Sequence, residues 1–511
     1  MSIKAIWWTL DRSLGRMLLK TATTTVLLIL LIAAFPACGL GQPAAAAGEE
    51  KFVFETRSKQ RVEAFRGSFT VPENRRAKGS RMIAIKYVRL AATADNAGPP
   101  IVYLAGGPGA SGIEAINYRY QMFMAMRQHG DVIAVDQRGT GASNEVPECH
   151  SKQVVPITNE ISDRAFAEYY RRALKECLAF WRHSSVDLAG YNTVQSALDL
   201  EALRRHLGTD KIILWGTSYG SHLALAALKE MESGIDRVVI SSVEGLDQTI
   251  KLPARADDYV ARLQWAIDTQ PAAKAAYPDI AALMRRVHAK LDRKPLLVQL
   301  RSRDGSRIDY LLQRRDMQLL AAGLIADPRS AALLLDMYQV LDRGVAPPFE
   351  RIPARLLPDN FVDPGKPILL EGMPVAMDIA SGMTAERRSK VSKQAKTAIL
   401  GAYLDVTFVF DGLAPELDLG EAFRSKPKSD VPVLVLSGTL DGRTDIESQR
   451  EAVSDLRNVT LVTVKNAGHN LLDEHSQEVQ EMIDQFLERK PVHDATIAID
   501  LPDMAPKTAA Y

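Results

Sequence analysis

The sequence predicts an α/β fold: a mostly parallel sheet with helices on both faces and a large, mainly helical insertion. Continuous apolar strand patterns alternate with helical patterns as far as residue 246, which is typical of parallel strands buried on both faces. Helical patterns then dominate residues 247–428, and the strand pattern returns at VPVLVLSG from 431. With 511 residues, 46% of them apolar and 24% charged, the chain has the composition of an ordered globular protein with a large core.

The first part of the core is expected over residues 51–246. Residues 51–90 alternate apolar and polar residues, which predicts strands. Buried strands are expected at 101–107, 131–139, 211–216 and 237–243. Helices are expected at 163–182 and 193–207, the second capped by Thr193 and stopped by Gly208.

The insertion and the second part of the core follow. In 247–428, helices are expected at 257–269, 274–292, 315–325, 328–342 and 384–403, with one hairpin at 296–312. Residues 429–490 supply two further strands, VPVLVLSG and VTLVTV, and a last helix near 475–488. Residues 491–511 show no periodicity and are expected to form a loose tail.

Residues 1–50 resemble a targeting segment. A basic leader precedes ten apolar residues, Val26–Phe35, and then small residues, the three-part layout of a secretory signal. The segment is either cleaved after Ala47, lipidated at Cys38, or kept as an uncleaved anchor. Each alternative exports the chain to a periplasmic or secreted location, and the latter two associate it with a membrane.

Cys149 and Cys177 are the two cysteines outside this leader. An oxidising compartment favours a disulfide between them, and two buried free thiols are the alternative.

The strongest chemical motif is Gly216-Thr217-Ser218-Tyr219-Gly220, between a predicted strand and a predicted helix. This is the setting of a nucleophile elbow, in which a tight turn lifts the serine hydroxyl above the sheet. A serine hydroxyl needs a neighbouring base, which is expected later in the chain after an acid. His469 and Asp441 lie in loops after the last two strands in the required order, with Asp445 as a rival acid.

Acyl transfer also needs hydrogen-bond donors for the developing oxyanion. The Tyr219 N–H belongs to the residue directly after the nucleophile, and the Gly107 N–H lies in the glycine-rich loop Ala105–Gly109, into which the strand predicted at 101–107 runs. Together these residues predict a serine hydrolase. An epoxide hydrolase or a dehalogenase would carry an acid in place of Ser218.

At these motifs the chain resembles the α/β-hydrolase fold, specifically the prolyl and tripeptidyl aminopeptidase family. The resemblance spans about residues 60–490 and rests on GGPG, DQRGTGAS, GTSYG, SGTLDGRTD and AGHNLL. It implies Ser218 as nucleophile, Asp441 as acid and His469 as base. It also implies a cap over the site, and exported members often carry a cysteine pair around the helix after DQRGTGAS, which fits Cys149 and Cys177. One departure is Ala105, where the family has a histidine before GGPG.

The resemblance implies an aminopeptidase that takes short peptides. A substrate ammonium group would need an acid, and Glu244 and Asp378 are the candidates by position. A small-acyl esterase with the same triad is the first alternative, and an inactive, hydrolase-like binding lipoprotein is the second. Arg138 is expected to pair with nearby acids and to take no part in the chemistry.

The sequence points to no other class of ligand. It contains no metal-ligand spacing and no phosphate-loop motif, so no metal or other cofactor is expected. Lys and Arg number 63 against 62 Asp and Glu, a net charge of +1 that gives no indication of nucleic-acid binding.

Overall fold

The computed structural model describes residues 48–506 apart from 303, 348, 350–356 and 358. Most of the predicted signal or anchor segment, including Cys38, lies outside the described residues. No helix among the described residues is both long enough and apolar enough to cross a bilayer.

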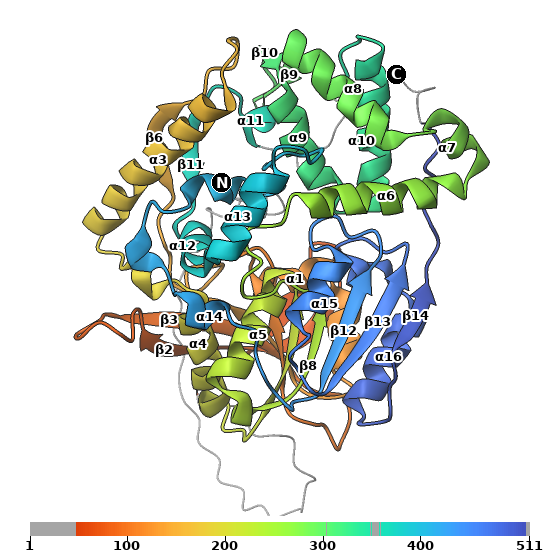
Figure 1. Cartoon of the computed structure of the whole chain (residues 1–511). Helices are drawn as coiled ribbons and strands as arrows, with labels where there is room; N and C mark the ends of the chain where they lie inside the picture. Colours follow the sequence, from red (N-terminus) through yellow and green to blue (C-terminus); the bar gives the residue numbers. More distant parts are fainter. Residues whose placement is uncertain (1–47, 303, 348, 350–356, 358, 507–511) are drawn as a thin grey trace, which may run out of the picture.

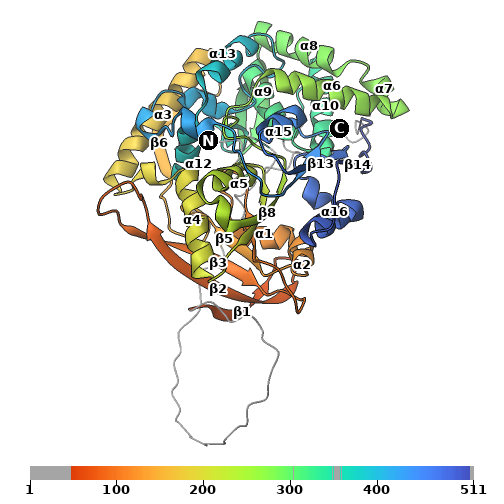
Figure 2. The same cartoon turned by 60° about the horizontal axis from the view of Figure 1, so that its bottom comes forward.

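A ten-stranded sheet forms the core, in the order β1-β2-β3-β5-β4-β7-β8-β12-β13-β14 (Figures 1 and 2). The strands from β5 to β14 in this order run parallel, while β1, β2 and β3 are antiparallel at one edge. The bounds are β1 Glu50–Glu55, β2 Arg61–Pro72, β3 Met82–Leu90, β4 Ile101–Leu104, β5 Val132–Asp136, β7 Ile212–Thr217, β8 Ile235–Ser241, β12 Val433–Gly438, β13 Val459–Lys465 and β14 Ala495–Ala498. The predicted mostly parallel sheet is confirmed.

Successive strand residues point to opposite faces of the sheet, and both faces are covered. Leu214 of β7 packs with α4 (Thr193–His206) and α5 (Tyr219–Glu230). Trp215, the next residue, packs on the other face with α1 (Gly112–Tyr118), α2 (Tyr120–Met126) and α16 (Gln477–Leu487). This double coverage explains why the central strands are continuous apolar runs.

The predicted helical insertion forms a cap with its own hydrophobic core. Figure 1 shows most of its helices grouped above the sheet. The bounds are α6 Ala254–Asp268, α7 Pro271–Ala276, α8 Ile280–Arg293, α9 Arg314–Leu324, α10 Pro328–Asp342, α11 Asp359–Val362, α12 Gly372–Ser381, α13 Ala385–Gln394 and α14 Glu421–Arg424. The predicted hairpin is confirmed as β9 Leu296–Arg301 paired with β10 Arg307–Leu312. The expected helix at 274–292 is two helices, and the one at 384–403 ends at Gln394.

Part of the insertion belongs to the sheet side of the molecule. Helix α12 packs into the same hydrophobic cluster as α4 and α5. Strand β11 (Pro367–Leu370) pairs with β6 (Cys149–Val154), which precedes α3 (Asp163–His183) in the chain. A disulfide joins Cys149 of β6 to Cys177 of α3, so this small sheet is tied to that helix.

The C-terminal residues differ from the loose tail that the sequence indicated. Residues 495–498 form β14, which pairs in parallel with β13 at the end of the sheet. Farther on, Met504 is fully buried in the cap core, and its N–H donates to the side chain of Gln270. The strand is only four residues long and buries one large side chain, Ile497, so its sequence pattern is too short to detect.

The start of α4 also needs a correction. Its N-cap is Asn192, whose side chain accepts the N–H of Gln195 at 3.0 Å, and Thr193 is the first helical residue. Asparagine caps helix ends at least as well as threonine, so the shift by one residue follows from capping preference.

Candidate active site

Every predicted catalytic loop follows the carboxyl end of a parallel strand. Gly107 follows β4, Ser218 follows β7, Asp441 follows β12 and His469 follows β13. Because these strands run in the same direction, their carboxyl ends meet at one edge of the sheet. The topology therefore brings the four loops to the same edge.

Ser218 sits in a tight turn between β7 and α5. Its φ is +54°, in a region that non-glycine residues rarely adopt, and its N–H donates to Ser241 of β8. A Cβ on Gly216 would come within 2.5 Å of the Gly220 carbonyl oxygen, and one on Gly220 within 1.9 Å of that of Leu104. Both flanking positions therefore require glycine, as in a nucleophile elbow.

The loop after β4 lies directly against this serine. A Cβ added to Gly106 would lie 3.2 Å from Ser218 Cβ and 3.8 Å from its Oγ. Gly107 has a φ of +112°, which glycine adopts without strain. Tyr219 is the first residue of α5, where backbone N–H groups have no partner within the helix. The two predicted oxyanion donors thus lie on the segments that flank Ser218.

The Gly106–Gly107 loop is held by a residue that the sequence did not single out. Gln137 donates from Nε2 to the carbonyl of Ala105 at 3.2 Å, and both residues are buried. Ala105 directly precedes Gly106, so this amide supplies one fixed contact to the loop. The only sequence signal was the nearby DQRGTGAS motif, to which Gln137 belongs.

Asp441 and His469 form a hydrogen-bonded pair. His469 Nδ1 lies 3.1 Å from Asp441 Oδ1 and 3.0 Å from Oδ2. The carboxylate is fully buried, and the imidazole is 15% exposed. Ser242, two positions before Glu244, donates its hydroxyl to the His469 carbonyl at 2.6 Å and so anchors the histidine loop beside β8.

The environment of Asp441 favours its ionised form. Burial raises the pKa of this carboxyl, but the His469 ring and hydrogen bonds from Thr444 outweigh burial and leave the pKa below its usual value. The Arg443 and Thr444 N–H groups each donate to Oδ1 at 2.8 Å, and the Thr444 hydroxyl donates to Oδ2 at 2.6 Å. A carboxylate held in this way can orient an imidazole and balance its positive charge.

The rival acid Asp445 has other partners. Arg262 donates to its Oδ2 at 2.5 Å, and its Oδ1 accepts the Glu447 N–H at 3.0 Å while capping α15 (Ile446–Ala452). His469 contacts Asp441 instead. The structure thus separates the two aspartates that the sequence left open.

The cap contacts both catalytic loops through the turn between α9 and α10. The Ile325 carbonyl accepts the Gly442 N–H at 3.1 Å, and the Ala326 carbonyl accepts the His469 N–H at 2.7 Å. A movement of this turn would therefore move the acid and the base together.

Helix α12 covers the other side of the site. A Cβ on Gly109 would lie 2.8 Å from Pro374 Cγ, and the Tyr219 hydroxyl donates to Met377 Sδ at 3.1 Å. Pro374 and Met377 belong to α12, so this helix packs on the predicted oxyanion loop and on the residue after Ser218.

The two candidate ammonium ligands have different surroundings. Glu244 is 1% exposed and accepts a hydrogen bond from Lys251 Nζ at 2.6 Å, so its charge is already balanced by a buried cation. Asp378 is 4% exposed and lies one helical turn after Pro374, on the side of α12 that meets the oxyanion loop. The pairing with Lys251 makes Glu244 a poor ligand for a substrate, and Asp378 is left as the candidate.

Arg138 pairs with an acid, as expected from the sequence. Its guanidinium is fully buried and makes two hydrogen bonds of 2.7 Å to Asp199. It also donates to the carbonyls of Glu73 and Gly190, which ties β2 and the start of α4 to the loop after β5.

A family model described as the α/β hydrolase fold matches residues 99–476. The chain belongs to the α/β-hydrolase fold family. Among curated proteins, the serine protease Hip1 of Mycobacterium tuberculosis is 29% identical to this hydrolase over 188 residues, 34% of this chain and 35% of Hip1. YuaR of Escherichia coli is 24% identical over 148 residues, 29% of this chain and 28% of YuaR. The matches thus span about a third of each relative's length or less.

Solved structures of the same fold resemble this α/β hydrolase at lower identity. Epoxide hydrolase A from Mycobacterium thermoresistibile gives a TM-score of 0.38 at 16% identity, covering 84% of this chain and all of the other. An esterase from Thermogutta terrifontis gives 0.35 at 14% identity, covering 83% of this chain and 98% of the other. Likeness at this level says nothing about the reaction.

Proposed function

We propose that this α/β hydrolase is a serine hydrolase in which Ser218 is the nucleophile, His469 the base and Asp441 the acid that orients the base. The observation that carries the proposal is the buried Asp441–His469 pair at the sheet edge where the Ser218 elbow also lies. Such a pair fixes the imidazole tautomer, because the Nδ1–H donates to the carboxylate and Nε2 is left to accept a proton.

The reaction follows from these roles. Ser218 Oγ attacks the substrate carbonyl carbon, and its proton passes to His469 Nε2. The Gly107 and Tyr219 N–H groups bind the oxyanion of the tetrahedral intermediate. His469 then gives the proton to the leaving group, whose bond to carbon breaks to leave an acyl-enzyme. Water, deprotonated by the same imidazole, releases the acyl group and restores Ser218.

The substrate we infer is a short peptide, cleaved near its free N-terminus. Partial similarity to a protein named as a serine protease supports peptide cleavage. A cap that contacts both the acid and the base loops supports selection of short substrates. Asp378, on the side of α12 that meets the oxyanion loop, is the residue we assign to the substrate ammonium group.

A small-acyl esterase is the second candidate, and one observation favours it. The ion pair between Glu244 and Lys251 leaves Asp378 as the one remaining candidate of the two acids considered for the substrate ammonium group. Both candidate functions use the same triad, so they differ only in which substrate the cap recognises.

We also propose that the protein works outside the cytoplasm. The leader of residues 1–50 supports export, and the Cys149–Cys177 disulfide is suited to an oxidising compartment. A lipidated Cys38 or an uncleaved leader would attach it to a membrane.

A comparison of three substrates tests the function. We would measure kcat/KM for a prolyl amide, its N-acetylated form and a short acyl ester, on wild type, Ser218→Ala and Asp378→Asn. Ser218→Ala should lose every activity that wild type shows on these substrates, together with its reaction with a fluorophosphonate probe. Asp378→Asn should lose about 30- to 1,000-fold on the free amine, as for loss of a buried charge pair, and keep ester cleavage.

Three outcomes separate the candidates. A requirement for the free amine supports the aminopeptidase, and equal cleavage of the N-acetylated amide supports the esterase or an internal cleavage. Undiminished turnover by Ser218→Ala contradicts the serine mechanism itself. Ser196→Ala is the control for serine removal, because Ser196 Oγ is buried without a hydrogen-bond partner among the described residues.

A further inference from the structure

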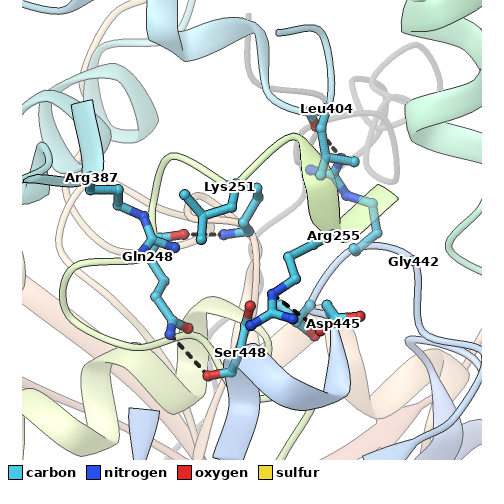
Figure 3. A pocket seen from close by; sticks show the side chains of 11 residues that line it. Gln248, Lys251, Arg255, Arg387, Leu404, Gly442, Asp445 and Ser448 are labelled. Atoms are coloured by element: carbon cyan, nitrogen blue, oxygen red, sulfur yellow. Dashed lines mark hydrogen bonds and ion pairs between the residues drawn. The ribbon is translucent and has the colours of Figure 1, made fainter. Parts of the chain in front are cut away.

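A cavity lined by cations lies between the cap and the core, and no triad side chain lines it. Figure 3 shows Lys251 and Arg387 on one side of it and Arg255 with Asp445 on another. Lys251 lies in the connection that enters the cap after β8, and Arg255 lies in the first turn of cap helix α6. Arg387 belongs to cap helix α13, and Arg443 belongs to the loop of Asp441. We propose that this cavity binds one chloride ion, which joins the cap to the catalytic loop.

The charges around the cavity leave one cation without an acid. Four of the cations around the cavity have an acid within 4 Å. Lys251 pairs with Glu244 at 2.6 Å, and Arg387 pairs with Asp247 at 3.8 Å. Arg255 pairs with Asp258 at 3.1 Å and with Asp445 at 3.6 Å, and Arg262 pairs with Asp445 at 2.5 Å. Within the described part of the chain, no carboxylate lies within 4 Å of Arg443. Its Nη1 donates to the carbonyls of Ala322 and Leu404 instead.

Donor groups remain available to an anion. Arg255 Nε is buried and makes no hydrogen bond among the described residues, and its nearest acid oxygen, Asp445 Oδ1, is 3.6 Å away. Arg387 is 5% exposed and donates from Nε to the Ile250 carbonyl at 2.7 Å, with its nearest acid at 3.8 Å. Burial lowers the pKa of Arg387, and the charge of Arg255 lowers it further, although Asp247, Glu451 and Glu244 oppose this. Buried cations that act on one another in this way are stabilised by a counter-ion.

The cavity is small, which favours a small ion. It has room for about one or two water molecules, so a compact anion suits it better than a bulky group such as a peptide carboxylate. A monatomic anion fits this space and can accept hydrogen bonds from several directions at once. Asp445 also lines the cavity, but its oxygens are already bound by Arg262 and the Glu447 N–H.

The ion would act on the catalytic loop through Arg443. The Arg443 backbone N–H donates to Asp441 Oδ1 at 2.8 Å, while its side chain reaches cap carbonyls. An anion that holds this guanidinium together with Arg387 of the cap therefore stabilises the closed arrangement of cap and acid loop.

Chloride binding can be measured without any assay of activity. We would record the ³⁵Cl NMR linewidth of sodium chloride with full-length wild type, with Arg387→Gln and Arg255→Gln, and with Arg388→Gln as the matched control. Arg388 is the next residue on the same helix, and it pairs with Asp411 at the surface, away from the cavity. Thermal unfolding in chloride and in gluconate at equal ionic strength gives a second readout.

We expect saturable line broadening by wild type and Arg388→Gln, reversed by bromide but not by sulfate. The two cavity variants should lose it. The Tm of wild type should rise by about 2 °C between 1 and 100 mM chloride, and not in gluconate. Should Arg387→Gln fail to fold, the more exposed Arg255→Gln decides the question.

Two results would overturn the proposal. One is wild-type linewidths no broader than those of the cavity variants. The other is a Tm that responds equally to chloride and gluconate, which would show general screening. Neither result depends on the substrate or on the triad, so failure of this proposal can be distinguished from failure of the proposed function.

Discussion

Thr444 binds the carboxylate of Asp441 twice, with its N–H to Oδ1 at 2.8 Å and its hydroxyl to Oδ2 at 2.6 Å. Its hydroxyl oxygen also lies 3.3 Å from His469 Nδ1. Thr444 comes three residues after the acid in SGTLDGRTD, yet only the fold shows that it contacts both partners. In the proposed mechanism it is a positioning residue, because its contacts reach the reaction only through Asp441 and His469.

Replacement of the Thr444 hydroxyl should weaken catalysis without unfolding the protein. Thr444→Val keeps the volume but removes a hydrogen bond to a charged group, a loss of about 1.5–3 kcal/mol. We expect kcat/KM to fall about 10- to 100-fold. The acidic limb of the pH profile should also move upward, because a bond that lowers the Asp441 pKa is gone. Thr444→Ser keeps the hydroxyl and should stay close to wild type; equal profiles for all three proteins would contradict the role.

A methyl group at position 106 should disturb the nucleophile. Gly106 has no positive φ, so alanine is compatible with its backbone, but the new Cβ would lie 3.2 Å from Ser218 Cβ and from the Thr217 carbonyl oxygen. We expect Gly106→Ala to lower kcat by about 100-fold through displacement of the reacting groups. The Tm measured by circular dichroism should change little. A fully active variant would show that this loop does not lie against the serine.

The stability of the protein at acid pH should depend on Asp441. Its pKa is lowered in the folded state, so ionised Asp441 stabilises the fold above the ordinary carboxyl pKa of about 4. This contribution is lost as the pH falls through the lower, folded-state pKa. We would measure the free energy of unfolding in urea for wild type and Asp441→Asn. We expect the difference between the two values to decrease from pH 6 to pH 3. A difference that is constant with pH would contradict the lowered pKa.

Loss of the disulfide should destabilise the region around β6, β11 and α3. The bond closes a loop with a sequence separation of 28 residues. In the chain-entropy model, removal of a disulfide that closes a loop of this length lowers the free energy of unfolding by about 3.5 kcal/mol. We expect the double variant Cys149→Ala, Cys177→Ala to lose about this much in denaturant unfolding. Alkylation of the exported wild type without reductant should give no adduct on either cysteine, and two adducts would refute the bond.

The residues proposed for the chemistry of the site could be predicted from the sequence, whereas most of the residues around them could not. Ser218, Asp441 and His469 could be predicted because each lies in a short loop after a strand, and parallel strands place such loops together. The choice between Asp441 and Asp445 needed three-dimensional contacts, since both aspartates lie in one loop.

Side-chain contacts that have no sequence pattern account for what the sequence could not show. Glu244 is balanced by Lys251, seven residues later, and nothing in the pattern indicates that both side chains are buried. Gln137 contacts Ala105 from a loop 32 residues away. Helix α12 reads as an apolar cap segment, but it packs on the core cluster and on the oxyanion loop.

The family match ends at residue 476, but the sheet does not. A fragment cut at that boundary would lack α16 and β14. Strand β13 would then expose a row of unpaired N–H and C=O groups, a template for another chain. The cap would also lose Met504 and keep an apolar hole in its place. Such a fragment would contain Ser218, Asp441 and His469 and would still be expected to self-associate. A domain boundary taken from sequence similarity alone would therefore give an aggregating protein even though it includes the whole triad.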